Sequence, residues 1–147
     1  MAGRKRHVVV DTLGLPLAVQ VQPASVQDPT GAPAVLAEAK QRAPNLQLLW
    51  GDGRDGGPTV AAAATAVGLR VEVVKKPPDQ KGFQVLPYRW VVERTFGWFG
   101  KYRRLAGRDF ETNPRNSETW IKLCVCNLLV RRLTSPLKWK RKKEYSS

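Results

Sequence analysis

Residues 46–74 read LQLLWGDGRDGGPTVAAAATAVGLRVEVV, and their pattern indicates the fold class. Its first part, residues 46–50, is a short apolar run that predicts a strand and leads directly into Gly51-Asp52-Gly53. Residues 58–67 are rich in alanine and precede a glycine, which predicts a helix, and residues 69–74 predict another strand. Strand, helix and strand in this order are typical of an α/β fold. Asp52 is then expected at the C-terminal end of its strand, the edge at which open α/β sheets bind ligands.

The segment before this unit predicts a hairpin and a helix. Residues 7–10 and 17–22 have the composition of strands, and the Gly and Pro between them predict that the two strands pair antiparallel. Residues 28–31 predict a turn, and the helix that follows is expected to end near Pro44.

The segment after the unit predicts two more helices. Residues 75–82 carry prolines and charges and predict an exposed loop, and a long helix is expected to start around Tyr88. Residues 113–116 break the chain again, and Ser117 can cap a last helix. Most positions of that helix are apolar, so we expect it to be mostly buried.

The charge of the chain favours a polyanionic partner. Its 147 residues include 25 Lys and Arg against 12 Asp and Glu, a formal charge of +13, and its length fits one domain. Residues 89–108 concentrate cations around a single acid, Glu93. Residues 134–147 form a basic tail, expected to be disordered, that either contacts a partner or is simply solvated. Nucleic acid is therefore the first partner to consider.

Other classes of protein are disfavoured. No apolar run approaches the roughly 20 residues of a bilayer-spanning helix, so we expect no membrane contact and a cytoplasmic, nucleoid-associated protein. Cys124 and Cys126, with only His7 elsewhere, supply too few ligands for a zinc site. We expect both cysteines to be reduced thiols in the core.

A second informative stretch is residues 86–105, LPYRWVVERTFGWFGKYRRL. It places one carboxylate, Glu93, among aromatic and cationic residues, which indicates an acid that holds a metal on a DNA-binding helix. Most of its aromatic residues are expected to pack in the core. Arg103 and Arg104, beside Tyr102, are the best candidates for phosphate contacts.

Cleavage of a phosphodiester by metal ions needs carboxylates that converge from different elements. Asp52 and Glu93 are suitable, one at the end of a strand and one in a helix. Each also has a simpler interpretation. Asp52 can form a turn with its flanking glycines, and Glu93 can pair with Arg89 one turn earlier, which is worth about 0.3 kcal/mol on a helix. Both alternatives stay open from spacing alone.

Read in order, several stretches resemble the catalytic part of the bacterial insertion-sequence DDE transposases: GRKRHVVVDTLGLP at 3–16, LLWGDG at 48–53, RWVVERTF at 89–96 and YRRL at 102–105. The resemblance spans about residues 3–133. It implies an RNase H-like mixed sheet flanked by helices, in which Asp52 is the second catalytic Asp and Glu93 the final Glu, together holding Mg²⁺ or Mn²⁺. It also implies double-stranded DNA partners, both transposon ends and target DNA, with contacts from Arg89, Arg94, Lys101, Arg103 and Arg104.

The chain departs from the family pattern in two places. Arg54 and Asp55 follow Gly53, where the family has glycines and an aromatic residue. The family's first acid belongs to a strand before residues 4–10, whereas this sequence starts at Met1. We therefore expect residues 1–133 to form a transposase DDE domain without its first strand. Alone, it should be inactive in DNA strand cleavage and transfer. Its expected protein partner is the missing N-terminal part of the transposase or a second copy of this chain, as a homodimer. The alternative is a non-catalytic DNA-binding regulator or a remnant of a transposase.

Overall fold

A computed structural model describes residues 3–51, 57–74, 88–107 and 109–135, and the structural statements below concern these residues. Their elements, in chain order, are β1 (Arg4–Val10), β2 (Pro16–Pro23), α1 (Asp28–Arg42), β3 (Leu48–Gly51), α2 (Pro58–Ala66), β4 (Arg70–Val73), α3 (Arg89–Phe99) and α4 (Pro114–Thr134). This mixture of strands and helices confirms the predicted α/β class.

The predicted hairpin is present. β1 and β2 pair antiparallel along their length, with one irregularity beside Val10. In the turn, one carboxylate oxygen of Asp11 accepts hydrogen bonds from the backbone N–H groups of Leu13, at 2.9 Å, and Leu15, at 2.8 Å. Gly14 follows with a φ of +80°, a conformation that glycine adopts at little cost. The turn is therefore fixed by its own residues.

The predicted strand-helix-strand unit is also present. β3 and β4 pair in parallel, with α2 as the crossover between them. The single mixed sheet expected from the sequence is not found among the described residues, however. They form two separate sheets of two strands each, β1 with β2 and β3 with β4.

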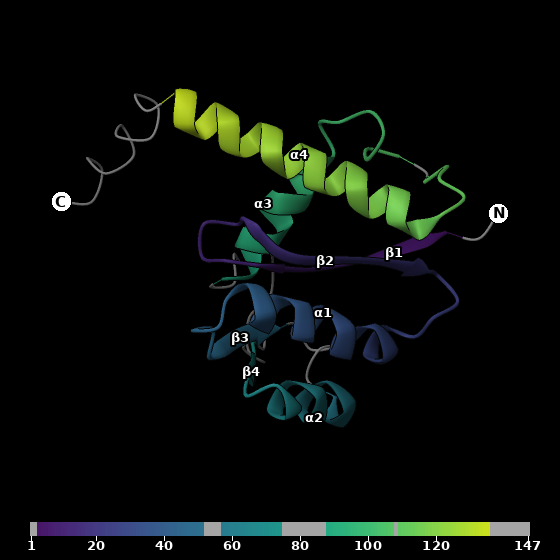
Figure 1. Ribbon diagram of the computed structural model, residues 1–147. Coiled ribbons are helices and arrows are strands. Elements are labelled where there is room, and N and C mark those ends of the chain that lie inside the picture. The colour runs from purple at the N-terminus through teal and green to yellow at the C-terminus, as the bar shows by residue number, and fades with distance from the viewer. Residues whose placement is uncertain (1–2, 52–56, 75–87, 108, 136–147) are drawn as a thin grey trace, which may run out of the picture.

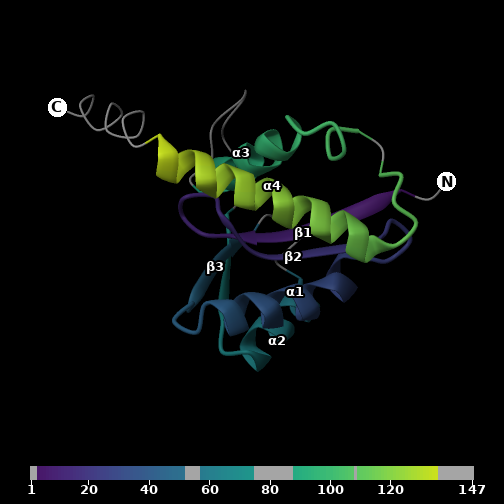
Figure 2. The ribbon, with the colours of Figure 1, turned by 45° about the horizontal axis from the view of Figure 1, so that its top comes forward.

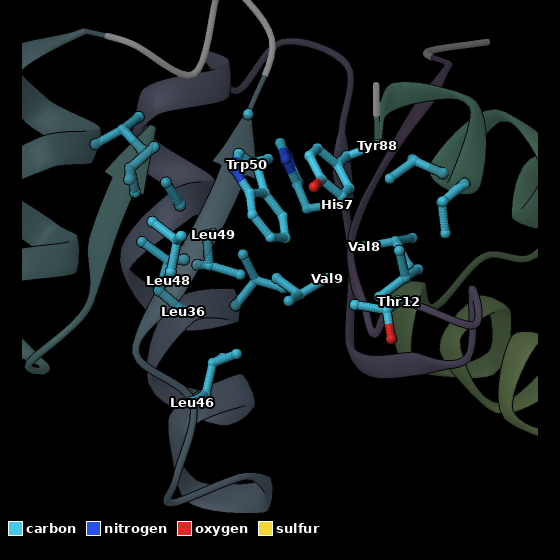
Figure 3. Close-up of a pocket in the computed structure, with 18 of the residues that line it drawn as sticks. His7, Val8, Val9, Thr12, Leu36, Leu46, Leu48, Leu49, Trp50 and Tyr88 are labelled. Atoms are coloured by element: carbon cyan, nitrogen blue, oxygen red, sulfur yellow. The ribbon is translucent and has the colours of Figure 1, made fainter. Parts of the chain in front are cut away.

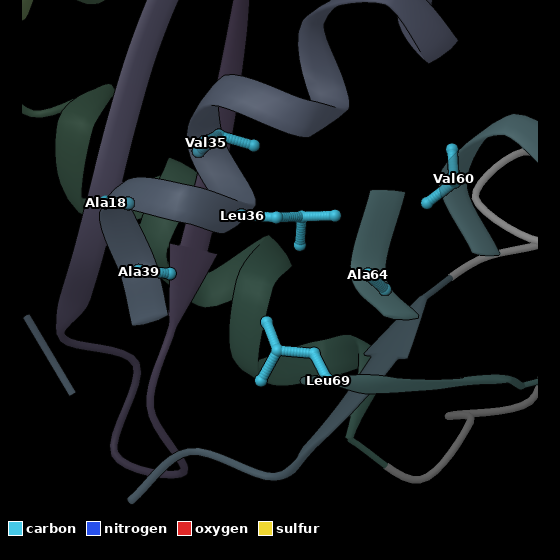
Figure 4. Close-up of a cluster of buried hydrophobic side chains, with 7 residues drawn as sticks. All are labelled: Ala18, Val35, Leu36, Ala39, Val60, Ala64 and Leu69. Carbon is cyan, nitrogen blue, oxygen red and sulfur yellow. The ribbon is translucent and has the colours of Figure 1, made fainter. Parts of the chain in front are cut away.

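The hairpin lies between two helical layers. α4 covers one face of the hairpin and α1 the other, with α2 beyond α1 (Figures 1 and 2). Because side chains alternate along a strand, β2 contributes to a separate core on each face. Ala18 joins one cluster with Val35, Leu36, Ala39, Val60, Ala64 and Leu69 (Figure 4). Val19 and Val21 join the other cluster with Phe99, Leu105, Ile121 and Cys124.

Two helices start earlier than predicted. The turn predicted at 28–31 is wrong because α1 already begins at Asp28, with Pro29 in its first turn, where a missing N–H costs nothing. α4 begins at Pro114, and its cap is Asn113, whose side chain accepts a hydrogen bond from Arg115 N at 3.0 Å. Ser117 is therefore a buried residue inside the helix and not its cap.

The two C-terminal helices also differ in extent and burial. α3 ends at Phe99, next to Gly100, so the long helix expected from Tyr88 is one of 11 residues. Of α4, only three residues are buried: Ser117, Ile121 and Cys124. The prediction that α4 is mostly buried is wrong because only one of its faces meets the hairpin. Cys126 is likewise exposed, and both cysteines are free thiols.

Candidate functional site

Glu93 lies on the outer face of α3. Val91, Thr95 and Phe99 recur every four residues and bury the opposite face of the helix. The Glu93 side chain is 62% exposed, and its Oε1 lies 3.2 Å from Nε of Arg89. The ion pair that the spacing predicted is therefore present. Such an exposed pair is weak and leaves the carboxylate accessible to a stronger cation.

A ring stack joins the end of β3 to the start of α3. The rings of Trp50 and Tyr88 are 4.0 Å apart between centroids and within 6° of parallel. Tyr88 has a φ of +66°, which is strained for an aromatic residue. Gly51 is the last described residue of β3, and Asp52 lies outside the described residues. The stack thus joins the end of β3 to the residue that precedes α3 (Figure 3).

Arg94 is used within the fold. Its Nη2 donates a hydrogen bond to the backbone oxygen of Leu13 in the hairpin turn, at 2.8 Å. The guanidinium also lies 4.5 Å from the ring centroid of Trp90 and 4.9 Å from that of Trp98. Arg94 therefore clamps α3 to the β1–β2 turn, and its role as a DNA contact stays a prediction.

Arg132 of α4 joins the same arrangement. Its guanidinium lies 4.7 Å from the ring centroid of Trp98 and 3.5 Å from the oxygen of Leu13. Burial, and then the like charge of Arg94, lowers the pKa of the Arg132 side chain. Two cations thus share one carbonyl and one indole ring.

Thr95 completes the contact with the turn. The side chain is fully buried, and its hydroxyl lies 2.7 Å from the oxygen of Gly14 and 3.1 Å from that of Val91. A Cβ atom added to Gly14 would lie 2.9 Å from that hydroxyl. The turn and α3 are therefore in close contact with no room for a larger residue.

The remaining predicted DNA contacts follow α3 in a turn region. Lys101 and Arg103 are exposed. Nη1 of Arg104 lies 3.0 Å from Oε1 of Glu111, and its guanidinium lies 4.8 Å from the ring centroid of Trp120. Lys101 and Arg103 are thus the cations of this group that are most available to an external partner.

Sequence reasoning missed three parts of this arrangement. The spacing of four residues could have predicted one of these parts, a cation between two rings on one helix face, formed by Trp90, Arg94 and Trp98. The Trp50–Tyr88 stack and the approach of Arg132 carry no such local signal, because each joins elements that are distant in the sequence.

The described part of the chain holds no group of three or more His, Cys, Asp or Glu side chains placed to bind one metal ion. Glu93 offers carboxylate oxygens, the ligand type that Mg²⁺ and Mn²⁺ prefer, on an accessible face. An exposed carboxylate of this kind can supply one ligand of such an ion. Within the same ranges, no helix is both long and apolar enough to span a bilayer.

Comparison with known proteins agrees with these features. Residues 1–129 match the family model described as Transposase DDE domain. The chain is also 29% identical, over 131 residues, to a protein of Burkholderia cepacia provisionally named a transposase for insertion sequence element IS402. That match covers 84% of this chain and 61% of the relative, so the chain spans less than two thirds of the relative's length. No solved structure matches the chain. With most of its length matched by the family model, the chain belongs to the transposase DDE domain family.

Proposed function

We propose that this chain is the DNA-binding and strand-cleaving segment of an insertion-sequence transposase with an RNase H-like arrangement, and that residues 1–133 form its DDE domain and residues 134–147 a basic tail. The observation that carries the proposal is the stack of Trp50 on Tyr88. It ties the strand that precedes Asp52 to the helix that bears Glu93, as two acids that share one site require.

Asp52 and Glu93 are the residues that would hold Mg²⁺ or Mn²⁺. Such an ion, when bound, polarises a phosphate oxygen and lowers the pKa of a bound water or hydroxyl. Glu93 is exposed and loosely held by Arg89, so it can exchange its partner without disturbing the buried face of α3. Other segments of a longer transposase, or a second copy of the chain, would complete this metal site.

The cations that follow α3 would bind the phosphates beside the cut, on transposon ends and target DNA. Lys101 and Arg103 are exposed in this region, and Arg104 is oriented by Glu111 and Trp120. Removing one cation that neutralises a phosphate lowers the slope of log affinity against log salt by about 0.9. We expect Arg103→Gln to reduce this slope by about that amount on duplex DNA, measured by fluorescence anisotropy.

Arg42→Gln is the matched control, because Arg42 is an exposed arginine of α1, on the other side of the hairpin. It should leave the salt slope unchanged. Equal reductions of the slope in both variants would show that binding depends on net charge and not on the region after α3.

Cleavage is tested with this chain joined to the part of the Burkholderia cepacia relative that it does not match. We expect Mg²⁺-dependent nicking of element-end DNA that disappears in Glu93→Gln and in Asp52→Asn, while DNA binding persists. Unchanged nicking in Glu93→Gln would refute the assignment. Salt-dependent binding without any nicking would instead favour a non-catalytic DNA-binding regulator.

A further inference from the structure

A cavity of about 420 Å³ lies in the segment that joins α3 to α4. It is lined by Arg103, Arg104, Phe110 and Glu111. Three of these residues, the two arginines and Phe110, are exposed, so the cavity opens to solvent. Its volume falls in the range of small-ligand sites, roughly 300–1,000 Å³, and is sufficient for one nucleotide.

Packing does not explain the aromatic residue in this cavity. Phe110 is 76% exposed, whereas the next most exposed aromatic residue in the described ranges, Tyr88, is 49% exposed. Phenylalanine is among the residues most often buried in folded proteins. The ring of Phe110 therefore gains little from burial within this fold, and contact with an external apolar group would cover it.

Hydrogen bonds fix the backbone beside Phe110. Nη2 of Arg4 in β1 donates to the backbone oxygens of Glu111, at 3.2 Å, and Thr112, at 2.9 Å. Oδ1 of Asp109 accepts a hydrogen bond from the backbone N–H of Glu111, at 3.0 Å. A side chain on a fixed backbone loses less conformational freedom when it binds, and this favours binding. The loop thus holds an exposed ring in a defined place.

The cavity also carries a net positive charge. Its one carboxylate, Glu111, faces two arginines. Oε1 of Glu111 accepts hydrogen bonds from Nη1 of Arg104, at 3.0 Å, and from Nε1 of Trp120, at 2.9 Å. Arg104 also lies over the Trp120 ring, 4.8 Å from its centroid. Glu111 therefore holds Arg104 in place, and the exposed Arg103 is suited to an external phosphate.

We propose that this cavity binds one unpaired nucleotide of a DNA strand, with its base stacked on the ring of Phe110 and its phosphate on Arg103. Every base has a face that can stack on an aromatic ring, and aromatic rings beside cations bind single strands with little regard to sequence. A base inside a duplex is covered by its neighbours, so it must leave the stack before a protein ring can reach its face. The occupant is therefore a single-stranded nucleotide and not a base pair.

This role rests on the proposed function, since DNA is the ligand of both, and it adds a preference for unpaired bases. The cations after α3 would bind phosphates whether or not a base is attached to the strand at that point. Phe110 would contact only the base. Two overhangs with the same phosphates, one with bases and one without, therefore separate the two contributions.

The test uses the full chain and two labelled duplexes, one with a short thymidine overhang and one with an abasic overhang of the same length. We expect the thymidine probe to bind at least about fivefold more tightly in fluorescence anisotropy, the lower end of what stacking of one base contributes. Phe110→Ala should remove this preference, so that the two probes bind alike. Phe110→Trp should retain it, because an indole ring also stacks, and Phe110→Leu should lose most of it.

Leu133→Ala is the matched control, because Leu133 is an 80% exposed apolar residue of α4 that does not line the cavity. It should leave the preference unchanged. A 2-aminopurine base in the overhang gives a second measurement, because its fluorescence falls when it stacks on a ring. The unmodified chain should quench this fluorescence, and Phe110→Ala should not.

An unchanged preference in Phe110→Ala, with circular dichroism showing the variant folded, would overturn the proposal. Equal binding of both probes by the unmodified chain would also overturn it. So would weaker self-association of Phe110→Ala in sedimentation with the preference intact, since the ring would then meet a second copy of the chain. Absence of binding to either probe would refute this role and the proposed function together. Nicking that survives Glu93→Gln, with the preference lost in Phe110→Ala, would refute only the proposed catalytic site.

Discussion

Replacement of Arg94 by Ala should destabilise the fold without weakening DNA binding. The side chain donates one charged hydrogen bond to Leu13 and lies over the rings of Trp90 and Trp98. A charge-assisted hydrogen bond contributes about 1.5 kcal/mol and each cation–π contact about 0.5–1 kcal/mol. Relief of repulsion from Arg132 offsets part of this sum. The expected loss in the free energy of unfolding is therefore about 2 kcal/mol.

The assay is unfolding in urea, monitored by circular dichroism. Arg94→Lys should recover only part of the loss, because an ammonium cannot reproduce the planar guanidinium between two rings. Arg103→Ala is the control, since that arginine is exposed, and it should change stability by less than about 0.5 kcal/mol. An Arg94→Ala variant as stable as the control, with a reduced salt slope for DNA, would refute the clamp and make Arg94 the DNA contact that the family resemblance implies.

Three further predictions follow from the packing. Gly14→Ala should lower the free energy of unfolding by about 2 kcal/mol or more, measured by urea unfolding, because the φ of Gly14 is +80° and the added Cβ meets Thr95 and Trp98. Gly68→Ala is the control and should lower it by only about 1 kcal/mol, because the φ of Gly68 is +71° but nothing lies within 4 Å of the added Cβ. Ile121→Ala should lose about 2–5 kcal/mol in the same assay, because that side chain is fully buried, and a smaller loss would contradict the packing of α4 on the hairpin. Burial raises the pKa of the Cys124 thiol to about 11, partly opposed by Arg6, so iodoacetamide at pH 8 should modify the exposed Cys126 and spare Cys124. Folding favours the neutral form of the Cys124 thiol, because burial raises its pKa. This preference stabilises the folded protein fully below the pKa of the unfolded thiol, near about 8.5. The stabilisation is lost as pH rises toward the folded pKa of about 11. Equal modification of both cysteines in the folded protein would contradict this environment.

Much of the candidate site could be anticipated from local patterns. The spacing of Arg89 and Glu93 predicted their ion pair, and the contact is present. The cations concentrated in residues 89–108 predicted a local basic surface, and Lys101 and Arg103 of this region are exposed, whereas Arg94 is partly buried. What spacing could not show is which cations the fold itself uses, since Arg94 and Arg103 have the same chemistry and differ only in what packs against them.

Local sequence patterns predicted the order of strands and helices, the hairpin, the strand-helix-strand unit and the basic character, and the motifs indicated the family. These depend on side-chain periodicity, turn residues and composition, which act over a few neighbouring residues. Only the packing of distant elements shows that Arg94 reaches Leu13, 81 residues away, that Trp50 stacks on Tyr88, and that residues of β1 and β3 line one cavity (Figure 3). Contacts of this kind arise only when distant elements pack together, and no local pattern in the chain specifies the result.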